Sequence, residues 1–273
     1  MNDAGPPPDG NSDLETIRRD IDGVDASLLQ LFAQRLQLAD KLVKAKAPQA
    51  GLPLRPGREV AMLRKLVSTA PAPLEREVVI ELWRAVMTAA LRRQRIIDVV
   101  VGGGRGDPTR LFDIARRHFG ARTRIKDVGD AQAALQKVTE NPETMVAVTA
   151  WPAAPSVGAW WPALSERRFG NLHLIAGLPL LGAGTDEPEA AVFAASPNEE
   201  AGGDVSLLLA FDPHHRLQRA LNEHGLVGKE VARAEPRVLV RIEGFLAIDD
   251  QRAAALTQSG LDSVRVLGSY ARI

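Results

Sequence analysis

Cysteine is absent from this chain of 273 residues, and neither sign of charge is in excess. Without cysteine there is no disulfide framework, no thiolate nucleophile and no cysteine-based zinc site, and a reducing compartment is expected. Lys plus Arg number 34 and Asp plus Glu number 34, so the formal net charge is zero. The chain therefore lacks the long-range field of a general nucleic-acid binder or a polybasic membrane-surface protein.

Long hydrophobic runs are missing as well. No stretch approaches the ~18 consecutive apolar residues that a membrane-spanning helix needs. Residues 1–13 contain no apolar run that would make a signal peptide, and we expect residues 1–12 to be a disordered tail. Hydrophobic residues still make up 45% of the chain, which is enough to bury a core. These features predict a cytoplasmic protein that interacts with neither nucleic acid nor membrane.

The charge is unevenly distributed along the chain. Residues 14–95 carry fifteen Lys or Arg against nine Asp or Glu, whereas the rest of the chain is neutral to slightly acidic. A small basic unit inside a neutral chain favours a small anionic ligand over a polymer.

The first third of the chain has the pattern of three helices. Between Leu14 and Ala47 there is no proline, and apolar residues recur in steps of four and three. These residues are Ile17, Ile21, Val24, Leu28, Leu31, Leu38 and Leu42. Such a helix would be ~50 Å long, so much of it is expected to pack on a partner subunit. Further helices are predicted over residues 58–68 and 74–95, and together they give an all-α domain over residues 13–96.

Strands and helices alternate after residue 96. Strands are predicted over 96–101, 144–148, 172–175, 190–194, 205–211, 238–242 and 263–267, and helices over 109–119, 216–223 and 251–258. We divide this part into an α/β lobe over residues 97–197 and, after a polar linker, a module over residues 204–273. The β-α-β-β-α-β order of the last module predicts a ferredoxin-like fold.

Charged and polar residues interrupt the apolar faces of the predicted helices. Arg35 stands where the pattern of the first helix requires an apolar residue, and Lys46 follows almost in phase. Glu59 lies on the apolar stripe of the second helix, next to Arg58, and Gln94 extends that of the third. One such arginine would usually belong to an internal salt bridge. Because the cations outnumber the acid, an external dianion is the better partner for the set.

Residues 14–94 resemble the all-helical chorismate mutases, which are dimers of interlaced three-helix protomers. The resemblance rests on the order and spacing of Leu14-Glu15-Thr16-Ile17-Arg18-Arg19-Asp20-Ile21, Val24-Asp25, Leu28-Leu29, Ala33-Gln34-Arg35, Lys44-Ala45-Lys46, Arg58-Glu59 and Gln94. It implies that Arg18 enters the active site of the other subunit and pairs with a substrate carboxylate. It also implies that Arg35 binds a carboxylate within its own subunit, that Arg58 assists carboxylate binding, and that Glu59 accepts a hydrogen bond from the ring hydroxyl.

The resemblance further implies that Lys46 and Gln94 flank the ether oxygen of the substrate. Catalytic roles are thus expected for Lys46, Gln94, Arg35 and Glu59, with no metal and no cofactor. Two positions depart from the family pattern. Many relatives carry Ser where Ala90 stands, and some carry Asp where Arg55 stands.

Val99 to Asp107 and Leu172 to Leu181 are similar to the opening turn and to a first-lobe segment of prephenate dehydratases, and Leu267-Gly268-Ser269-Tyr270 is similar to the end of an ACT regulatory domain. Residues 97–273 thus resemble these two domains in order, but lack the working parts. Ala191-Val192-Phe193 stands where the dehydratase carries a Thr-Arg-Phe motif, so the hydroxyl and the guanidinium are both gone. The effector motifs of the ACT domain are replaced by His215-Arg216-Leu217 and Ala234-Glu235-Pro236. We interpret this half as a truncated, non-catalytic dehydratase-like lobe and an ACT-like module.

The leading hypothesis is therefore a homodimeric chorismate mutase, an isomerase that converts chorismate to prephenate for phenylalanine and tyrosine biosynthesis. One alternative is a working bifunctional chorismate mutase/prephenate dehydratase. Another is a regulatory protein that uses the helices to dimerise and to act on a separate dehydratase. A complete ligand set argues against the regulatory alternative, because a pure dimerisation module has no use for Arg35 on its apolar face.

Overall fold

The computed structural model describes residues 10–45, 51–103, 108–152, 160–181 and 187–273. The chain divides into two compact units, Met1–Ala47 and Pro48–Ile273. Within the described ranges, no helix combines the length and the apolar character needed to cross a bilayer.

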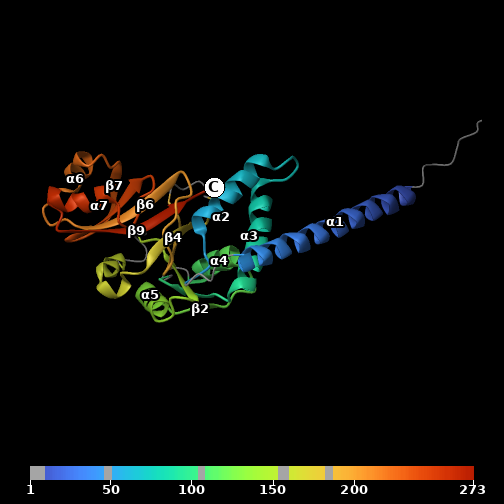
Figure 1. Cartoon of the computed structure of the whole chain (residues 1–273), viewed down its shortest axis with the longest axis horizontal. Coiled ribbons are helices and arrows are strands. Elements are labelled where there is room, and N and C mark those ends of the chain that lie inside the picture. The colour runs from blue at the N-terminus through green and yellow to red at the C-terminus, as the bar shows by residue number, and fades with distance from the viewer. Residues whose placement is uncertain (1–9, 46–50, 104–107, 153–159, 182–186) are drawn as a thin grey trace, which may run out of the picture. The chain divides into compact units, whose positions relative to one another are not determined.

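The first unit is a single helix, α1, Gly10–Ala45, labelled in Figure 1. It begins before the predicted start, so residues 10–12 are helical rather than part of a tail, and residues 1–9 lie outside the described residues. The predicted apolar stripe is present but exposed: Ile17, Ile21, Val24, Leu28 and Leu31 have exposed fractions between 44% and 60%. Among the described residues of its own unit, α1 has no second element that covers this stripe.

Helices α2, Pro56–Thr69, and α3, Arg76–Gln94, agree closely with the predicted ranges. Pro56 occupies the first helical turn, where its fixed φ favours helix and no donor is lost. Unlike α1, both helices bury one apolar face, although Val78 and Leu82 of α3 are exposed. Val60 and Leu63 of α2 and Met87 of α3 belong to the same core as Val99 and Val192 of the following region. The second and third mutase-like helices thus pack on the sheet that follows them in the chain.

A nine-stranded mixed sheet organises the second unit, as the sequence predicts in part. Its strands are β1 Asp98–Gly102, β2 Ile125–Asp127, β3 Met145–Ala150, β4 His173–Leu178, β5 Ala190–Ala194, β6 Asp204–Phe211, β7 Gly228–Ala234, β8 Arg237–Glu243 and β9 Ser263–Ala271. They are arranged in the order β2-β1-β3-β5-β4-β9-β6-β8-β7. β1 pairs in parallel with β2 and β3, whereas β5 is antiparallel to both of its neighbours.

Helices cover both faces of the first part of this sheet. Val99 and Val101 face α2, α3 and α4, Pro108–Phe119, whereas Val100 faces α5, Ala131–Glu140. The second face is completed by the 3₁₀ helices Trp161–Ser165 and Arg167–Phe169. Alternation of buried side chains along one strand thus separates two cores, with the mutase-like helices on one side.

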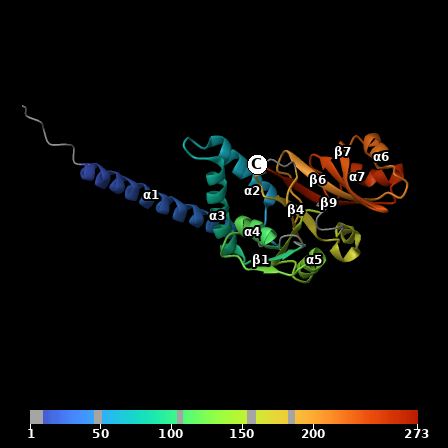
Figure 2. The same cartoon turned by 180° about the vertical axis from the view of Figure 1, so that it is seen from behind.

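Residues 204–273 have the predicted ferredoxin-like arrangement. The order β6-α6-β7-β8-α7-β9 contains α6 Leu217–Glu223 and α7 Gln251–Ala255, and all neighbouring strand pairs are antiparallel. Figures 1 and 2 both place α6 and α7 beside these strands, and their apolar residues share a core with Leu208 and Val240. The sequence pattern gave no separate strand for β7, whose residues are mostly half-exposed.

Gly268 joins the two parts of the sheet. β4 and β9 meet in parallel through one residue pair, Leu174 and Gly268. Gly268 has φ +138°, and a Cβ atom there would lie 2.1 Å from the carbonyl oxygen of Leu174. Only glycine fits, because both the left-handed backbone and the close approach exclude a side chain.

The C-terminal residues of the described chain are tied to α2 and α3. Arg64 Nη2 donates to Arg272 O at 2.6 Å, and its Nη1 donates to Ala201 O at 3.1 Å. Arg76 Nη2 donates to Ile273 O at 2.9 Å. These bonds to backbone carbonyls fix both the linker after β5 and the end of β9 on the mutase-like helices.

Candidate functional site

The predicted ligands on α1 lie in the first unit. Arg18 is exposed, and Arg35 is half-buried on the stripe between Leu31 and Leu38. Lys46 lies outside the described residues. The structure thus places Arg18 and Arg35 on one helix of the first unit. Arg58, Glu59 and Gln94 belong to the second unit.

Arg58 and Glu59 lie in the first turn of α2, and they differ in exposure. Arg58 is exposed, whereas the Glu59 side chain is only 22% exposed. Glu59 Oε2 accepts a hydrogen bond from Nη1 of Arg84, a residue of α3. A carboxylate in the first turn of a helix is also favoured by the helix dipole. Glu59 is therefore held in place by Arg84, whereas Arg58 is exposed.

Gln94 is the last residue of α3 and is exposed. Its Nε2 atom lies 3.5 Å from the carbonyl oxygen of Ala90, a long contact that a better acceptor would replace. Ala90 itself is buried, and its side chain contributes no polar atom. The structure thus puts Arg58 and Glu59 on α2 and Gln94 on the neighbouring helix α3. The Glu59 carboxylate is bound by Arg84, and the Gln94 amide contacts the backbone of its own helix.

A small cavity of about 30 Å³ lies beside Glu59, between α2, α3 and α4. Its lining includes Arg84, Met87 and His118. Arg84 is only 8% exposed, and its Nε and Nη2 atoms donate to the carbonyl oxygen of His118 at 3.2 and 2.7 Å. Burial, and then the charge of Arg84, holds the pKa of His118 well below its ordinary value, so this imidazole is neutral at neutral pH.

The sequence analysis missed Arg84 and His118. A signal for Arg84 is present: Ile80, Arg84, Met87 and Leu91 follow helical spacing, so the arginine interrupts an apolar stripe as Arg35 does. No comparable signal marks His118, because its role depends on how α4 ends against α3.

The segment that the sequence analysis compares with the dehydratase motif lies in the core. Ala191, Val192 and Phe193 belong to the central strand β5 and are fully buried. Ala191 pairs with Thr149 of β3, whose hydroxyl lies 3.5 Å from the Ala191 carbonyl oxygen. Apolar side chains packed in two cores leave this strand without a group that could assist a leaving hydroxyl.

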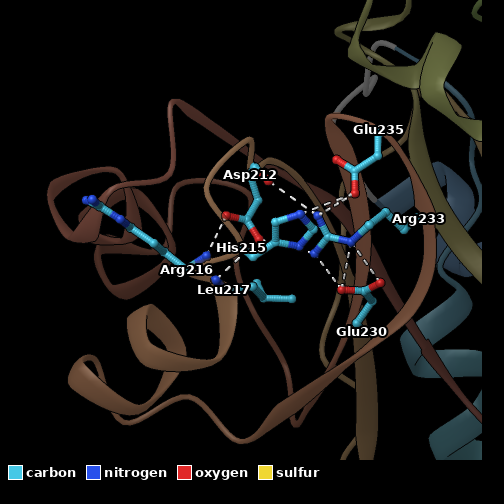
Figure 3. Close-up of polar contacts among 7 residues, drawn as sticks. All are labelled: Asp212, His215, Arg216, Leu217, Glu230, Arg233 and Glu235. Atoms are coloured by element: carbon cyan, nitrogen blue, oxygen red, sulfur yellow. Dashed lines mark hydrogen bonds and ion pairs between the residues drawn. The ribbon is translucent and has the colours of Figure 1, made fainter.

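The two segments that the sequence analysis compares with effector motifs approach each other in the ferredoxin-like module, where His215 faces Glu235 (Figure 3). Asp212 is fully buried and accepts hydrogen bonds from the backbone of Arg216 at 2.7 Å and from Arg233 Nη2 at 3.2 Å. Arg233 also binds Glu230 at 2.6 Å, and this hydrogen bond is the main reason that the pKa of Arg233 is raised. His215 Nε2 lies 3.6 Å from Glu235 Oε1. Asp212 and Arg233, which flank the two segments, thus pair with each other, and Glu235 lies within 3.5 Å of Arg233 Nη1.

No group of three or more His, Asp or Glu side chains is placed to hold a metal ion in the ranges that the structure describes.

Comparison with known proteins gives one family match. Residues 17–95 match the family described as chorismate mutase type II. The bifunctional chorismate mutase/prephenate dehydratase of Neisseria gonorrhoeae is 36% identical over 103 residues, which are 38% of this chain and 27% of that protein. The protein of the same name from Pseudomonas aeruginosa is 30% identical over 112 residues, 39% of this chain and 30% of the relative. The T-protein of Haemophilus influenzae is 29% identical over 145 residues, 49% and 38% of the two chains. The matches thus span about a third of the length of these relatives.

Two solved structures are distantly similar. Prephenate dehydratase from Arthrobacter aurescens in complex with L-Phe is 13% identical, with 64% of this chain and 90% of that chain covered and a TM-score of 0.41. Prephenate dehydratase from Streptococcus mutans is 14% identical, with 65% and 100% covered and a TM-score of 0.41.

Proposed function

We propose that this chain, which carries a chorismate mutase type II domain at residues 17–95, is an isomerase that rearranges chorismate to prephenate. One observation carries the proposal: the matched segment includes every predicted ligand, from Arg18 to Gln94. The proposed role is a step in the biosynthesis of phenylalanine and tyrosine. A cytoplasmic location remains a prediction.

The proposed reaction is a unimolecular pericyclic rearrangement, which needs no nucleophile and no proton transfer. It needs a dicarboxylate held in its compact, reactive conformer. We assign one carboxylate to Arg18 of the second copy and the other to Arg35, with Arg58 assisting. The planar guanidinium forms two parallel hydrogen bonds to a carboxylate, which fixes orientation as well as charge.

Catalysis is assigned to the groups near the ether oxygen, which gains negative charge as its C–O bond lengthens. Lys46 supplies a point charge there and Gln94 an amide donor. One donor of this kind contributes roughly 3 to 4 kcal/mol to lowering a barrier. Glu59 accepts a hydrogen bond from the ring hydroxyl and so holds the ring in register with these donors.

The proposed assembly is a dimer in which α1 of each copy completes the site of the other. The exposed apolar stripe of α1 supports this, because a second copy offers the same stripe and can cover it. The stripe also carries Arg35, so dimerisation would bring ligands from different units together. We propose no nucleic-acid or membrane partner.

For residues 97–197 we propose a non-catalytic dehydratase-like lobe, and for residues 204–273 an ACT-like module with no conventional effector site. The buried apolar segment Ala191–Phe193 and the internally paired Arg233 support this. A bifunctional mutase/dehydratase is the second candidate, because two of the similar proteins carry that name. A regulatory partner of a separate dehydratase is the third, and the complete ligand set disfavours it.

The test is to incubate the purified full chain with chorismate at neutral pH and to identify the product before any acid treatment. The proposal expects prephenate to accumulate without phenylpyruvate. Enzymatic phenylpyruvate formation would support the bifunctional candidate, and unchanged chorismate would support the regulatory one.

A pair of variants on α1 tests the ligand assignment. Arg35→Ala is expected to abolish turnover without unfolding the protein, since burying an unpaired cation is unfavourable in the free enzyme. Arg19→Ala removes an exposed arginine from the same helix, away from the stripe, and should retain turnover. Equal activity of the two variants would remove Arg35 from the site.

A further inference from the structure

Arg84 is the charged side chain that connects Glu59 to the region after residue 97. It projects from the middle of α3 and is only 8% exposed, so its charge must be compensated within the protein. Nη1 donates to Oε2 of Glu59, and Nε and Nη2 donate to the carbonyl oxygen of His118. One rigid guanidinium thus contacts α2 on one side and α4 on the other.

The His118 carbonyl is a favourable acceptor because of its place in α4. His118 is the residue before the last one of the helix. The last four carbonyl groups of a helix have no N–H donor within the helix. A cation there also interacts favourably with the helix dipole. Since the His118 imidazole is neutral, it adds no second positive charge beside Arg84. The end of α4 therefore fixes where the guanidinium lies.

Arg84 engages only one of the two carboxylate oxygens of Glu59. Within the described residues, no contact engages Oε1, although the side chain is only 22% exposed. A carboxylate held by one oxygen in this way keeps its orientation, and it presents the other oxygen to a ligand. This is the geometry that a hydroxyl-accepting residue needs.

We propose that Arg84 is a positioning residue of the mutase site: it orients Glu59 toward the substrate hydroxyl and makes the end of α4 part of the site. This inference rests on the proposed function. It gives the region after residue 97 a role in the mutase reaction that involves neither dehydratase chemistry nor an effector. The substrate class that it serves is a dicarboxylate with a ring hydroxyl.

The experiment is a double-mutant cycle in the full chain, with Arg84→Met, Glu59→Gln and the double variant assayed on chorismate. We expect Arg84→Met to lower kcat/KM about 10- to 100-fold, mainly through KM, because binding of the hydroxyl is lost. In the Glu59→Gln background the same substitution should change kcat/KM less than about twofold. Arg84→Lys keeps a positive charge beside Glu59 but not the planar fork, so its kcat/KM should lie between those of Arg84→Met and the unmodified chain.

Arg92→Met is the matched control, because Arg92 also lies on α3 and donates to a backbone carbonyl, Arg122 O at 2.7 Å, but has no contact with Glu59. It should keep kcat/KM within about twofold. Thermal midpoints measured by circular dichroism set an assay temperature at which every variant is folded.

Two results would overturn the inference. One is an equal loss from Arg84→Met in both Glu59 backgrounds, which would mean a purely structural role. The other is full activity of folded Arg84→Met. If the unmodified chain leaves chorismate unchanged, the proposed function itself fails and this inference fails with it, an outcome visible before any variant is compared.

Discussion

Helix α1 and the pair α2 and α3 share a sequence pattern and differ in what covers it. On α1, Leu28 and Leu31 are 44% and 60% exposed, whereas Leu63 of α2 is fully buried and Val79 of α3 is 2% exposed. The apolar face of α2 is covered by the sheet of its own chain, and the stripe of α1 is not covered by its own unit. Equal periodicity therefore does not reveal whether a helix is completed within the chain or by a second copy.

Charging the α1 stripe should have the largest effect. Leu28→Glu combined with Ile21→Glu is expected to dissociate the proposed dimer and to lower chorismate turnover more than about 100-fold, because both the interface and the shared site are lost. Light scattering after size-exclusion chromatography gives the mass in solution. Gln37→Glu, on the opposite side of α1, should leave both properties unchanged. A dimer that survives the double substitution would contradict the comparison.

Breaking the sheet joint tests the second unit. Gly268→Ala places a methyl group against the Leu174 carbonyl and forces an unfavourable φ, so we expect the free energy of unfolding to fall by about 3 kcal/mol. Urea denaturation followed by circular dichroism measures this. Gly129→Ala is the matched control: Gly129 also has positive φ, but a Cβ there would meet no atom within 4 Å. If the two variants lose the same stability, backbone strain alone accounts for the loss and the close approach of β4 does not.

Acid should weaken the contact between α3 and α4. Burial lowers the pKa of His118 in the folded protein, whereas the unfolded chain binds a proton near the ordinary value of about 6.5. Below that pH the unfolded state holds more protons, so the free energy of unfolding falls as the pH falls toward the folded pKa. His118→Gln should reduce this slope by up to about 1.4 kcal/mol per pH unit, measured by urea denaturation between pH 7 and pH 5.

A remaining slope is expected in that variant, because burial also lowers the pKa of His173. An unaltered slope in His118→Gln would mean that His118 is accessible to protons in the folded protein.

The smallest effect is expected at Gly23. This glycine lies inside α1, and a Cβ there would meet no atom within 4 Å. Gly23→Ala should raise the thermal midpoint, with about 0.5 to 1 kcal/mol of added helix stability. A lower midpoint would show that Gly23 packs against another surface in the assembly. The surface of α1 that a second copy covers would then be wider than the apolar stripe.

Much of the fold follows from local sequence. Helix ranges are predictable because Pro56 begins α2 and prolines follow it, and the ferredoxin-like order is predictable from alternating apolar runs. The packing of α2 and α3 on the sheet is not, since Val60 and Leu63 would be apolar with any covering surface. Periodicity identifies a buried face but carries no information about the partner.

The candidate site is predictable to a similar extent. Arg35 and Glu59 are visible because they interrupt apolar stripes, and Arg84 could be found by the same rule. His118 could not, because its backbone carbonyl contributes and any residue supplies one. A resemblance to a family identifies ligands that relatives share. A contact such as that between Arg84 and the His118 carbonyl is found only from the packing of this chain.

The hydrogen bonds of Arg64 have a consequence for the order of events during synthesis. Arg64 and its acceptor Arg272 are 208 positions apart in sequence. A ribosome therefore exposes α2 long before the carbonyl that Arg64 binds has been made. The sheet that covers Val60 and Leu63 is completed equally late, because β4 pairs with β9 through Gly268. The apolar faces of α2 and α3 are not covered until β9 has been made, and during that interval they are available to chaperones or to neighbouring nascent chains.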